Sequence, residues 1–500
     1  MLATVASATL LGVEGHPVRV EAHTSSGLPG YTVVGLPDTS CRESRDRVRS
    51  ALISSGHDWP LRRITVNLAP SHLRKVGAGL DLAIAVGLLA AEEVLEPECL
   101  RDLSFVGELG LDGSLRPLVG MLPLAAACRH RPVVPLASVN EARLCRAEAR
   151  GARTLAEVVA ALRGDEPWPE PGPAPPGPPP VAEPDLCEVR GQPVARAALE
   201  VAGAGGHHLL MSGPPGGGKT MLAERLPGLL PDLDDAEALA VTSVHSAAGR
   251  LRDGAGLIRR PPLRAPHHTA SLAALVGGGS TVLRPGEVSL ASGGVLFLDE
   301  LGEFPATHLD ALRQPLESGL MRVARAAVSV ELPARVLLVG ATNPCPCGFA
   351  GFGDCRCTEA QLARYRRRLS GPLLDRFDLR LAVGPPDPSV AFDGPLGEPS
   401  AAVAPRVAAA RARAAGRGVR ANRELRGRDL RRVAPLEPPA ERLLRDHLER
   451  GVLTMRGAER SRAVALTLAD LRGQDPPLTA GLVEEALLLR GGDGALVGHR

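Results

Sequence analysis

One stretch, residues 209–226, constrains the fold of this chain more than any other. The apolar run LLMS leads into G-x-x-x-x-G-K-T over residues 213–220, and MLAERL follows with the composition of a helix. A Gly/Pro-rich turn with no ligand is the alternative, but it would not account for a strand and a helix on either side. The stretch therefore predicts a phosphate-binding loop.

The residue types of this loop suit the phosphates of ATP. Glycines let backbone N–H groups point at phosphate oxygens, Lys219 supplies a compact positive charge, and the Thr220 hydroxyl can ligate Mg²⁺. Lys75 and Lys219 are the only lysines among 58 basic residues, and an arginine fork would not replace the ammonium here. We expect ATP and Mg²⁺ as cofactors, with the nucleotide bound by Gly213, Pro214, Pro215, Gly216, Gly217, Gly218, Lys219 and Thr220.

Composition narrows the classes of protein that the chain can belong to. A net charge of only +2 means that nucleic-acid contacts must come from local clusters, and 2% aromatic residues disfavour base-stacking platforms. We find no leader pattern and no apolar window of about eighteen residues, so we expect a cytoplasmic protein with no membrane partner. Nine cysteines in such a compartment favour metal ligands or buried small side chains over disulfides.

The 500 residues suggest about three or four domains, and we expect a multidomain α/β protein. Composition divides the chain into five segments: an α/β domain (1–163), a proline-rich linker (164–184), a P-loop core with a parallel sheet (185–381), a Pro/Gly-rich hinge (382–404) and a helical lid (405–500). Within the first domain, alternation predicts strands at 3–11, 18–22, 64–68 and 103–107, and helices at 39–55, 80–91 and 122–130.

Two further apolar runs end in polar residues that suit ATP hydrolysis. The run 294–298 precedes Asp299 and Glu300, a Walker B pattern in which Asp299 can hold Mg²⁺ through water and Glu300 can polarise the attacking water. The run 335–342 precedes Asn343, which is placed to orient that water, as sensor 1 does in AAA+ ATPases. The structural alternative for Asp299 and Glu300 is a solvated acidic turn after a core strand. The structural alternative for Asn343 is a residue that only caps the end of its strand.

Arg376 lies in the segment GPLLDRFD, a setting used for an arginine finger. Such a finger adds positive charge where the transition state needs it and can be worth about 10³–10⁵ in rate. Because a finger that acts in trans comes from a neighbouring subunit, Arg376 also predicts a ring.

Four cysteines follow Asn343 closely. Cys345, Cys347, Cys355 and Cys357 lie within thirteen residues, and four thiolates can close a tetrahedral Zn²⁺ site. The C-x-C spacing is tighter than the usual spacing, although intervening glycines give the loop freedom. Structural zinc and free or redox-active thiols are both open.

Six segments together resemble the ComM/YifB family of Mg-chelatase-like AAA+ ATPases with a Lon-protease-like (S5-type) N-terminal domain. They are PHHT (266–269), LVGGG (275–279), PGE (285–287), LDEL (298–301), NPCPCG (343–348) and SGPLLDR (370–376). The resemblance implies a homohexamer that hydrolyses ATP, binds single-stranded or branched DNA and promotes branch migration during natural transformation. It also implies that Arg456 is the lid arginine, sensor 2, which approaches the γ-phosphate when the lid closes.

The N-terminal domain resembles the Lon-like fold but lacks its Ser–Lys dyad. Gly79 falls at the serine position and Leu122 near the lysine position, and neither side chain can act as nucleophile or base. Ser71 with Lys75 is an alternative pair, which we consider weaker than a scaffold or docking role.

Two segments are candidates for DNA contact. The resemblance implies an insert around 265–289 and a hairpin over 320–332, both lining the pore of a ring, and we expect Arg322 and Arg325 to touch phosphate. A solvated hairpin is the equal alternative. His267 and His268 fit a structural or pore-loop role better than metal binding.

An arginine-rich segment, 406–432, could also grip DNA, although a solvated face is at least as plausible. Two other functions are open: an ATPase subunit of a magnesium chelatase that acts on porphyrin, and a protein-remodelling chaperone. Porphyrin-dependent or casein-stimulated hydrolysis would separate these from a DNA motor.

Overall fold

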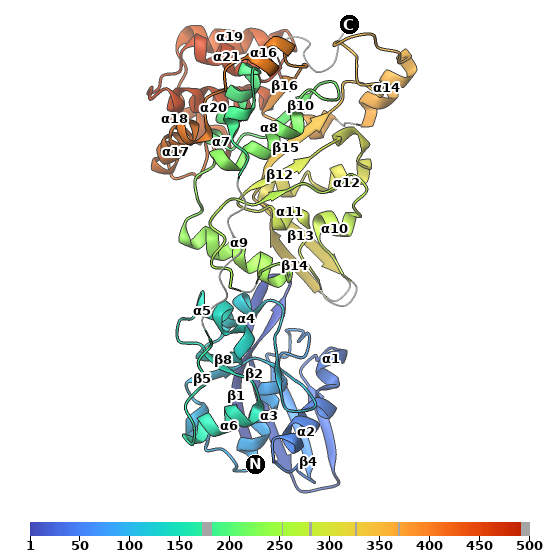
Figure 1. Ribbon diagram of the computed structural model, residues 1–500, viewed down its shortest axis with the longest axis vertical. Helices are drawn as coiled ribbons and strands as arrows, with labels where there is room; N and C mark the ends of the chain where they lie inside the picture. The colour runs from blue at the N-terminus through green and yellow to red at the C-terminus, as the bar shows by residue number, and fades with distance from the viewer. Residues whose placement is uncertain (173–182, 253, 280–282, 326–327, 369–370, 492–500) are drawn as a thin grey trace.

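The computed structural model describes the chain except for residues 173–182, 253, 280–282, 326–327, 369–370 and 492–500. It is a multidomain α/β protein with the N-terminal domain at one end of its long axis (Figure 1). The P-loop domain extends from there to the other end, where the helical lid packs beside it. Within the described residues, none of the helices combines the length and apolar composition that crossing a membrane requires.

The N-terminal domain is built on a seven-stranded mixed sheet with the order β3-β4-β2-β1-β5-β8-β9. Its strands are β1 Leu2–Leu11, β2 Glu14–Ser25, β3 Gly30–Val34, β4 Arg63–Ala69, β5 Leu103–Phe105, β8 Arg131–Pro135 and β9 Arg150–Ala152, with the two-residue strands β6 Glu108–Leu109 and β7 Leu115–Arg116 forming a separate hairpin. In β2 the buried residues Val18, Val20 and Ala22 alternate with more exposed ones, as the sequence pattern predicts.

The helices of this domain are α1 Thr39–Arg42, α2 Ser44–Ser54, α3 Asp81–Ala91, α4 Met121–Ala127, α5 Val139–Arg143 and α6 Leu155–Arg163. Helix α3 is buried on all sides, which its uninterrupted apolar sequence requires. The single helix expected at 39–55 is two helices, interrupted at Glu43, with the first capped by the Asp38 carboxylate on the Cys41 N–H.

The P-loop domain contains a five-stranded sheet in which all strands are parallel. Its order is β11 Leu263–Arg264, β12 Val295–Leu298, β15 Leu337–Thr342, β10 Leu209–Ser212 and β16 Leu379–Ala382. Strands β10, β12 and β15 are buried throughout, which explains their continuous apolar sequences. Helices α7 Pro193–Gly205, α8 Lys219–Arg225, α9 Asp235–Ala247, α10 Leu272–Val276, α11 Glu287–Leu290, α12 Ala306–Ala311, α13 Pro315–Ser318, α14 Glu359–Arg368 and α15 Gly371–Leu374 complete the domain.

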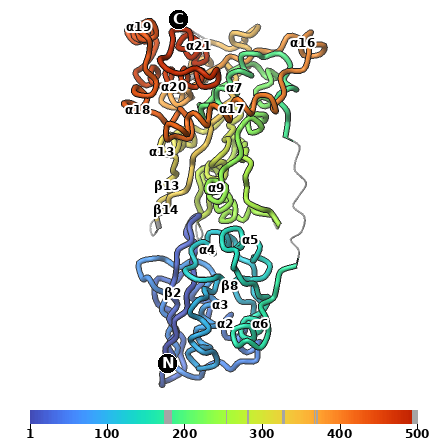
Figure 2. Tube along the Cα trace, turned by 90° about the vertical axis from the view of Figure 1, so that its left-hand side faces the viewer, coloured from blue at the N-terminus to red at the C-terminus, as the bar shows by residue number. Residues whose placement is uncertain are grey.

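The hairpin expected before Asn343 is present, as β13 Leu320–Arg325 and β14 Val328–Pro333. It extends from the P-loop domain toward the N-terminal domain (Figures 1 and 2). There the β1–β2 turn meets it: Gly12 lies against Val330 and Leu332, and Val13 is buried in the same apolar cluster. The N-terminal domain therefore packs on the face of the hairpin that carries Val330 and Leu332.

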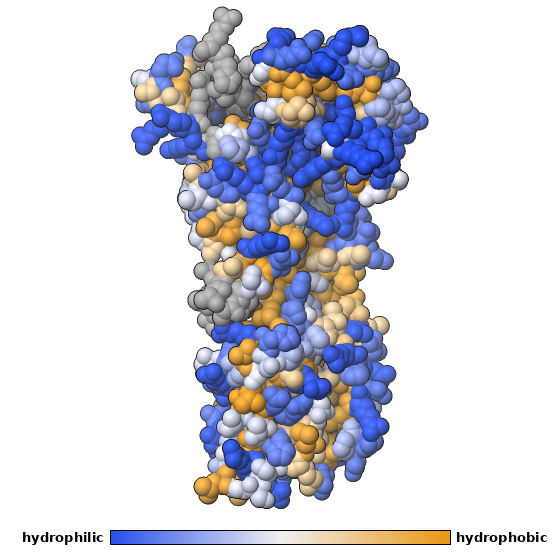
Figure 3. Space-filling model, turned by 180° about the vertical axis from the view of Figure 1, so that it is seen from behind, coloured by the Kyte–Doolittle hydropathy of each residue, from blue (hydrophilic) through white to orange (hydrophobic). Residues whose placement is uncertain are grey.

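The lid consists of helices at the C-terminal end of the chain: α16 Pro388–Asp393, α17 Ser400–Gly416, α18 Gly427–Val433, α19 Pro438–Glu449, α20 Met455–Leu471 and α21 Ala480–Leu489. The segment predicted as a hinge, 382–404, includes α16 and the first turn of α17. Val407 and Val464 of the lid share one core with Ala198 of α7. Hydrophilic side chains cover much of the lid surface seen from behind (Figure 3).

A buried carboxylate joins the lid to the sheet. Asp378, just before β16, has no exposed side-chain surface and accepts a hydrogen bond of 2.8 Å from Arg423 Nε. Arg460 of α20 lies 3.3 Å from its other oxygen, Oδ1, whereas the N–H of His208, just before β10, donates to Oδ2, the oxygen that accepts from Arg423. These two arginines hold the pKa of Asp378 well below its usual range against the opposing effect of burial.

We predict that Asp378→Asn lowers the free energy of unfolding by about 3–5 kcal/mol, because it leaves two arginines without their buried partner. Asp375→Asn is the matched control, since Asp375 is 41% exposed and pairs with Arg380 at 3.6 Å. That control should change stability by less than about 0.5 kcal/mol. Urea unfolding monitored by circular dichroism gives both values, and equal midpoints for the two variants would contradict this role.

Candidate functional site

The phosphate-binding loop lies where β10 passes into α8, as predicted. Position 213 requires glycine, because a Cβ there would lie 1.9 Å from the Val383 carbonyl oxygen. Positions 216 and 218 favour glycine for a different reason, since their φ values are +77° and +84°. Larger residues at these positions would push the loop off the sheet or strain its backbone. The loop conformation therefore depends on glycine at these positions, as expected of a loop whose backbone N–H groups bind phosphate.

Lys219 is the first residue of α8 and is folded back over the loop. Its Nζ donates to the carbonyl oxygens of Gly213 at 2.7 Å and Pro214 at 2.9 Å, and to Asn343 Oδ1 at 3.3 Å. Burial lowers the pKa of Lys219, and the nearby charge of Asp299 opposes that shift. The ammonium is thus positioned by three oxygens that phosphate oxygens can replace.

Thr220 and Asp299 meet at the same edge of the sheet. The Thr220 hydroxyl donates to Asp299 Oδ2 at 2.8 Å, and the Glu300 N–H donates to Asp299 Oδ1 at 2.9 Å. A hydroxyl beside a carboxylate is the oxygen-donor set that Mg²⁺ prefers when it also binds substrate phosphates. These residues fit the Mg²⁺ of a nucleotide complex.

Glu300 has a neighbour that the sequence did not reveal. Its carboxylate lies 3.0 Å from His268 Nδ1, and its backbone has a φ of +50°, which is unusual for a residue with a side chain. The His268 ring packs edge-on against Phe304. The pattern PHHT drew attention to His268, but only the fold brings it to Glu300.

Arg376 lies at the opposite edge of the sheet. The phosphate-binding loop follows β10, whereas Arg376 precedes β16, which runs parallel to β10 with Ser212 opposite Ala382. A four-residue strand spans about 13 Å, so Arg376 cannot reach the phosphates of its own subunit. Its guanidinium is nearly buried, lies 3.1 Å from Glu317, and donates to the carbonyl oxygens of Arg313 and Pro372.

Arg456 shares the partner of Arg376. Its Nη2 donates to the same Glu317 oxygen, so the two arginines lie together at this edge. The expectation that Arg456 approaches the γ-phosphate when the lid closes stays a prediction; in this structure the lid holds Arg456 beside Arg376. Burial raises the pKa of Glu317, but Arg456 and Arg376 outweigh it and lower that pKa overall.

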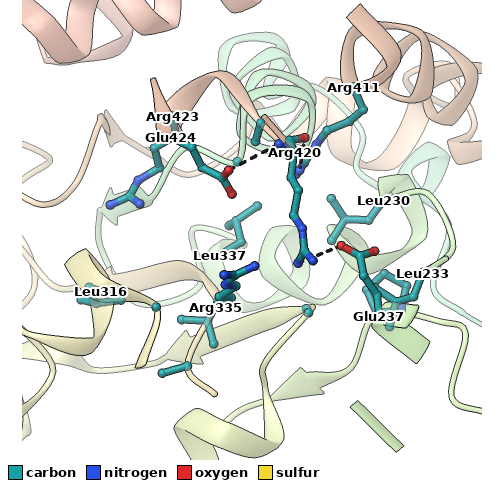
Figure 4. A pocket seen from close by; sticks show the side chains of 18 of the residues that line it. Leu230, Leu233, Glu237, Leu316, Arg335, Leu337, Arg411, Arg420, Arg423 and Glu424 are labelled. Atoms are coloured by element: carbon teal, nitrogen blue, oxygen red, sulfur yellow. Dashed lines mark hydrogen bonds and ion pairs between the residues drawn. The ribbon is translucent and has the colours of Figure 1, made fainter. Parts of the chain in front are cut away.

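The arginine-rich segment 406–432 forms part of the joint between lid and core. Arg406 pairs with Glu200 and Glu398, and Arg417 pairs with Asp470. Arg420 pairs with Glu237 at 2.9 Å across a pocket of about 410 Å³ (Figure 4). These contacts favour a structural role over the DNA grip that we considered from sequence.

The candidate DNA-contacting residues differ in what the structure shows. Arg322 is 63% exposed on β13 and pairs across the hairpin with Glu331 at 2.8 Å. The side chain of Arg325 is outside the described residues. His267 stacks beside His268 with ring centres 4.1 Å apart, and its Nδ1 lies 2.8 Å from the Thr269 hydroxyl.

The N-terminal domain does not form the alternative Ser–Lys pair. Lys75 is fully buried and its ammonium donates to the Pro70 carbonyl, whereas Ser71 is exposed. Among the described residues no hydrogen bond joins these two side chains. Gly79 lies against Leu118, and Leu122 is buried in the domain, in keeping with positions that carry no catalytic group.

The four clustered cysteines come together directly after Asn343. Their sulfur atoms all lie within 4.8 Å of one another, and each cysteine is a free thiol. The predicted cluster is thus formed, next to the phosphate-binding loop.

Three family models match consecutive parts of the chain. Residues 185–390 match the model described as magnesium chelatase, subunit ChlI, residues 20–137 match subunit ChlI of Mg-chelatase, and residues 397–490 match the ChlI C-terminal model. The matches cover the P-loop domain, much of the N-terminal domain and the lid.

The chain is also similar to individual proteins over its whole length. It is 43% identical to the uncharacterized protein YifB of Escherichia coli, covering 99% of this chain and 98% of the relative. It is 42% identical to the competence protein ComM of Haemophilus influenzae, covering 97% and 96%. A shorter stretch of 179 residues is 28% identical to the probable DNA helicase MCM9 of Arabidopsis thaliana, covering 36% of this chain and 23% of the relative.

We predict that Lys219→Ala and Glu300→Gln fail at different steps. Lys219→Ala removes a charged contact to phosphate worth about 1.5–3 kcal/mol, so ATP affinity should fall about 10- to 100-fold. Glu300→Gln should keep ATP affinity while the hydrolysis rate falls by about 10²–10⁴, because only the attacking water loses its base. Titration with a fluorescent ATP analogue and phosphate release measure the two quantities. Equal loss of affinity in both variants would contradict this division of roles.

Proposed function

Because the chain belongs to the YifB/ComM family of magnesium-chelatase-like AAA+ ATPases, we propose that it is a ring-forming DNA motor. In this proposal a homohexamer hydrolyses ATP in the cytoplasm, binds single-stranded or branched DNA and drives branch migration during uptake and recombination of incoming DNA. ATP and Mg²⁺ are the cofactors that the family implies.

The observation that carries the proposal is the division of the ATP site between two edges of one sheet. Lys219, Thr220 and Asp299 lie at one edge, while Arg376 lies at the other and cannot reach them within a subunit. A neighbour that places its arginine edge against this nucleotide edge makes a head-to-tail contact. Repeated contacts of this kind close into a ring.

Each residue then has a role in hydrolysis. The loop N–H groups and Lys219 hold the β- and γ-phosphates, and Thr220 and Asp299 hold Mg²⁺. Glu300 accepts a proton from the attacking water, which the Asn343 amide orients. The neighbour's Arg376 and Arg456 leave Glu317 and stabilise the charge that develops on the γ-phosphate.

DNA is the substrate that we favour for two reasons. The relative in Haemophilus influenzae is named a competence protein, and the shorter match is named a probable DNA helicase. The β13–β14 hairpin extends from the P-loop domain and carries the exposed Arg322, which can contact a backbone phosphate. The family-model name favours a second candidate, the ATPase subunit of a magnesium chelatase.

We predict that the purified protein migrates a synthetic three-strand junction in the presence of ATP and Mg²⁺. Hydrolysis should rise with branched DNA, and both activities should disappear in Lys219→Ala. Gel separation of labelled strands measures migration. Wild type and Lys219→Ala moving the junction equally would refute a motor. ATP hydrolysis stimulated only by porphyrin with chelatase partners would indicate a magnesium chelatase subunit instead of a DNA motor. Hydrolysis stimulated only by casein would indicate a protein-remodelling chaperone.

The hairpin has its own matched pair of variants. Arg322→Ala should weaken DNA binding and reduce the slope of log Kd against log salt by about 0.7–0.9 for one lost phosphate contact. Arg445→Ala is the control, because Arg445 is 65% exposed on lid helix α19 and pairs with Glu441. Arg445→Ala should leave the DNA affinity and the salt slope unchanged. If the two variants behave identically, the hairpin does not contact DNA.

A further inference from the structure

The four-cysteine loop brings four sulfur atoms within 4.8 Å of one another, close enough to share one metal ion. Cys345 Sγ lies 3.3 Å from Cys347 Sγ and 3.7 Å from Cys355 Sγ, and Cys347 Sγ lies 3.7 Å from Cys355 Sγ. Four sulfurs about 2.3 Å from a central Zn²⁺ would be separated by about 3.8 Å. A disulfide would instead hold two sulfurs at about 2.05 Å. Two of the three separations are close to the value for zinc coordination, the third is shorter, and all three are far longer than a disulfide bond.

The surroundings of the cluster support this reading. The Ala350 N–H donates to Cys345 Sγ at 3.3 Å, a contact of the kind that orients a coordinating thiolate. Cys345 is buried, Cys347 and Cys357 are half-buried, and Cys355 is exposed, so a metal can enter from solvent. Four thiolates in a tetrahedral arrangement select Zn²⁺ or iron over Mg²⁺ and Ca²⁺.

The same loop rests on the phosphate-binding loop. Gly348, with a φ of +87°, approaches Pro215 so closely that a Cβ there would lie 2.6 Å from the proline ring. Phe352 of the cysteine loop lies against Gly384. The residue before Gly384 is Val383, and its carbonyl oxygen faces Gly213 of the phosphate-binding loop. The cysteine loop therefore touches the phosphate-binding loop directly and also through the residues that follow β16.

The loop also begins at a residue of the ATP site. Asn343 accepts a hydrogen bond from Lys219 and is separated from Cys345 only by Pro344. A metal that fixes Cys345 would therefore restrain the backbone two residues from the Asn343 amide, which contacts Lys219 of the phosphate-binding loop. Residues 343–358 contain neither a helix nor a strand, and the backbone hydrogen bonds within the loop belong to turns, such as that from the Gly348 N–H to the Cys345 carbonyl at 3.0 Å.

We propose that Cys345, Cys347, Cys355 and Cys357 bind one Zn²⁺, and that this zinc loop holds Asn343 and the phosphate-binding loop in the conformation that binds nucleotide. The zinc has a structural role: four protein ligands leave no open position for chemistry. The second half of the proposal rests on the proposed ATPase function. Loss of the metal would free the cysteine loop. Nucleotide binding would then have to order this loop again, and that entropic cost would lower the affinity for ATP.

The test compares metal content and nucleotide affinity in the full-length protein. Protein purified without chelator should contain one zinc per chain by inductively coupled plasma mass spectrometry. Cys355→Ser should lose the zinc and bind a fluorescent ATP analogue about tenfold more weakly, since a disordered loop must be ordered on binding. Cys187→Ser, at a half-buried free cysteine of the same domain, should keep both properties.

Chelation of the wild-type protein provides a second route that needs no variant to fold. Zinc removal should increase hydrogen exchange in residues 343–357 and 213–220 and weaken nucleotide binding, and added Zn²⁺ should reverse both changes. Wild-type protein with no zinc, or with iron in its place, would overturn the site. Zinc loss with unchanged nucleotide affinity would overturn the coupling. Zinc-loaded protein that binds no nucleotide would instead refute the ATPase function and leave the metal site standing.

Discussion

The parallel direction of five strands is the constraint on which the nucleotide site depends. Because β10, β12 and β15 end at one edge, the residues that follow them converge there: Lys219, Asp299 and Asn343 lie within one hydrogen-bonded group. The same direction places Arg376, which precedes β16, at the other edge. Within one subunit the sheet therefore separates Arg376 from Lys219 and Asp299, and the proposed ring would bring the two edges of neighbouring subunits together.

The lid is joined to the sheet close to Arg376. Asp378 is two residues from Arg376 and is held by Arg423 and Arg460, so buried ion pairs connect the start of β16 to the lid. The Glu317 carboxylate forms ion pairs with both Arg376 and Arg456. In a ring, a change at the nucleotide of one subunit would act, through these two arginines, on the lid of the neighbouring subunit. That lid packs on the P-loop domain, from which the β13–β14 hairpin extends.

The sequence predicted the elements more completely than their relations. Apolar runs that end in GKT, DE and N identified the strands and the residues after them, because a buried parallel strand leaves a recognisable pattern. The shared contact of Arg456 and Arg376 with Glu317 was not predicted, since no local sequence pattern tells which residues a lid arginine faces. The contact of His268 with Glu300 and that of Gly348 with Pro215 join distant segments, so only the fold reveals them.

Mixing two inactive variants tests most directly whether the site is shared between subunits. Lys219→Ala keeps the arginine edge, and Arg376→Ala keeps the phosphate-binding loop. In mixed rings, about a quarter of the interfaces combine the two intact halves, because each head-to-tail contact takes one edge from each subunit. Hydrolysis should therefore return on mixing, to a clear fraction of the wild-type rate. Mixed rings that form but stay inactive, or Arg376→Ala rings with full activity, would contradict the shared site.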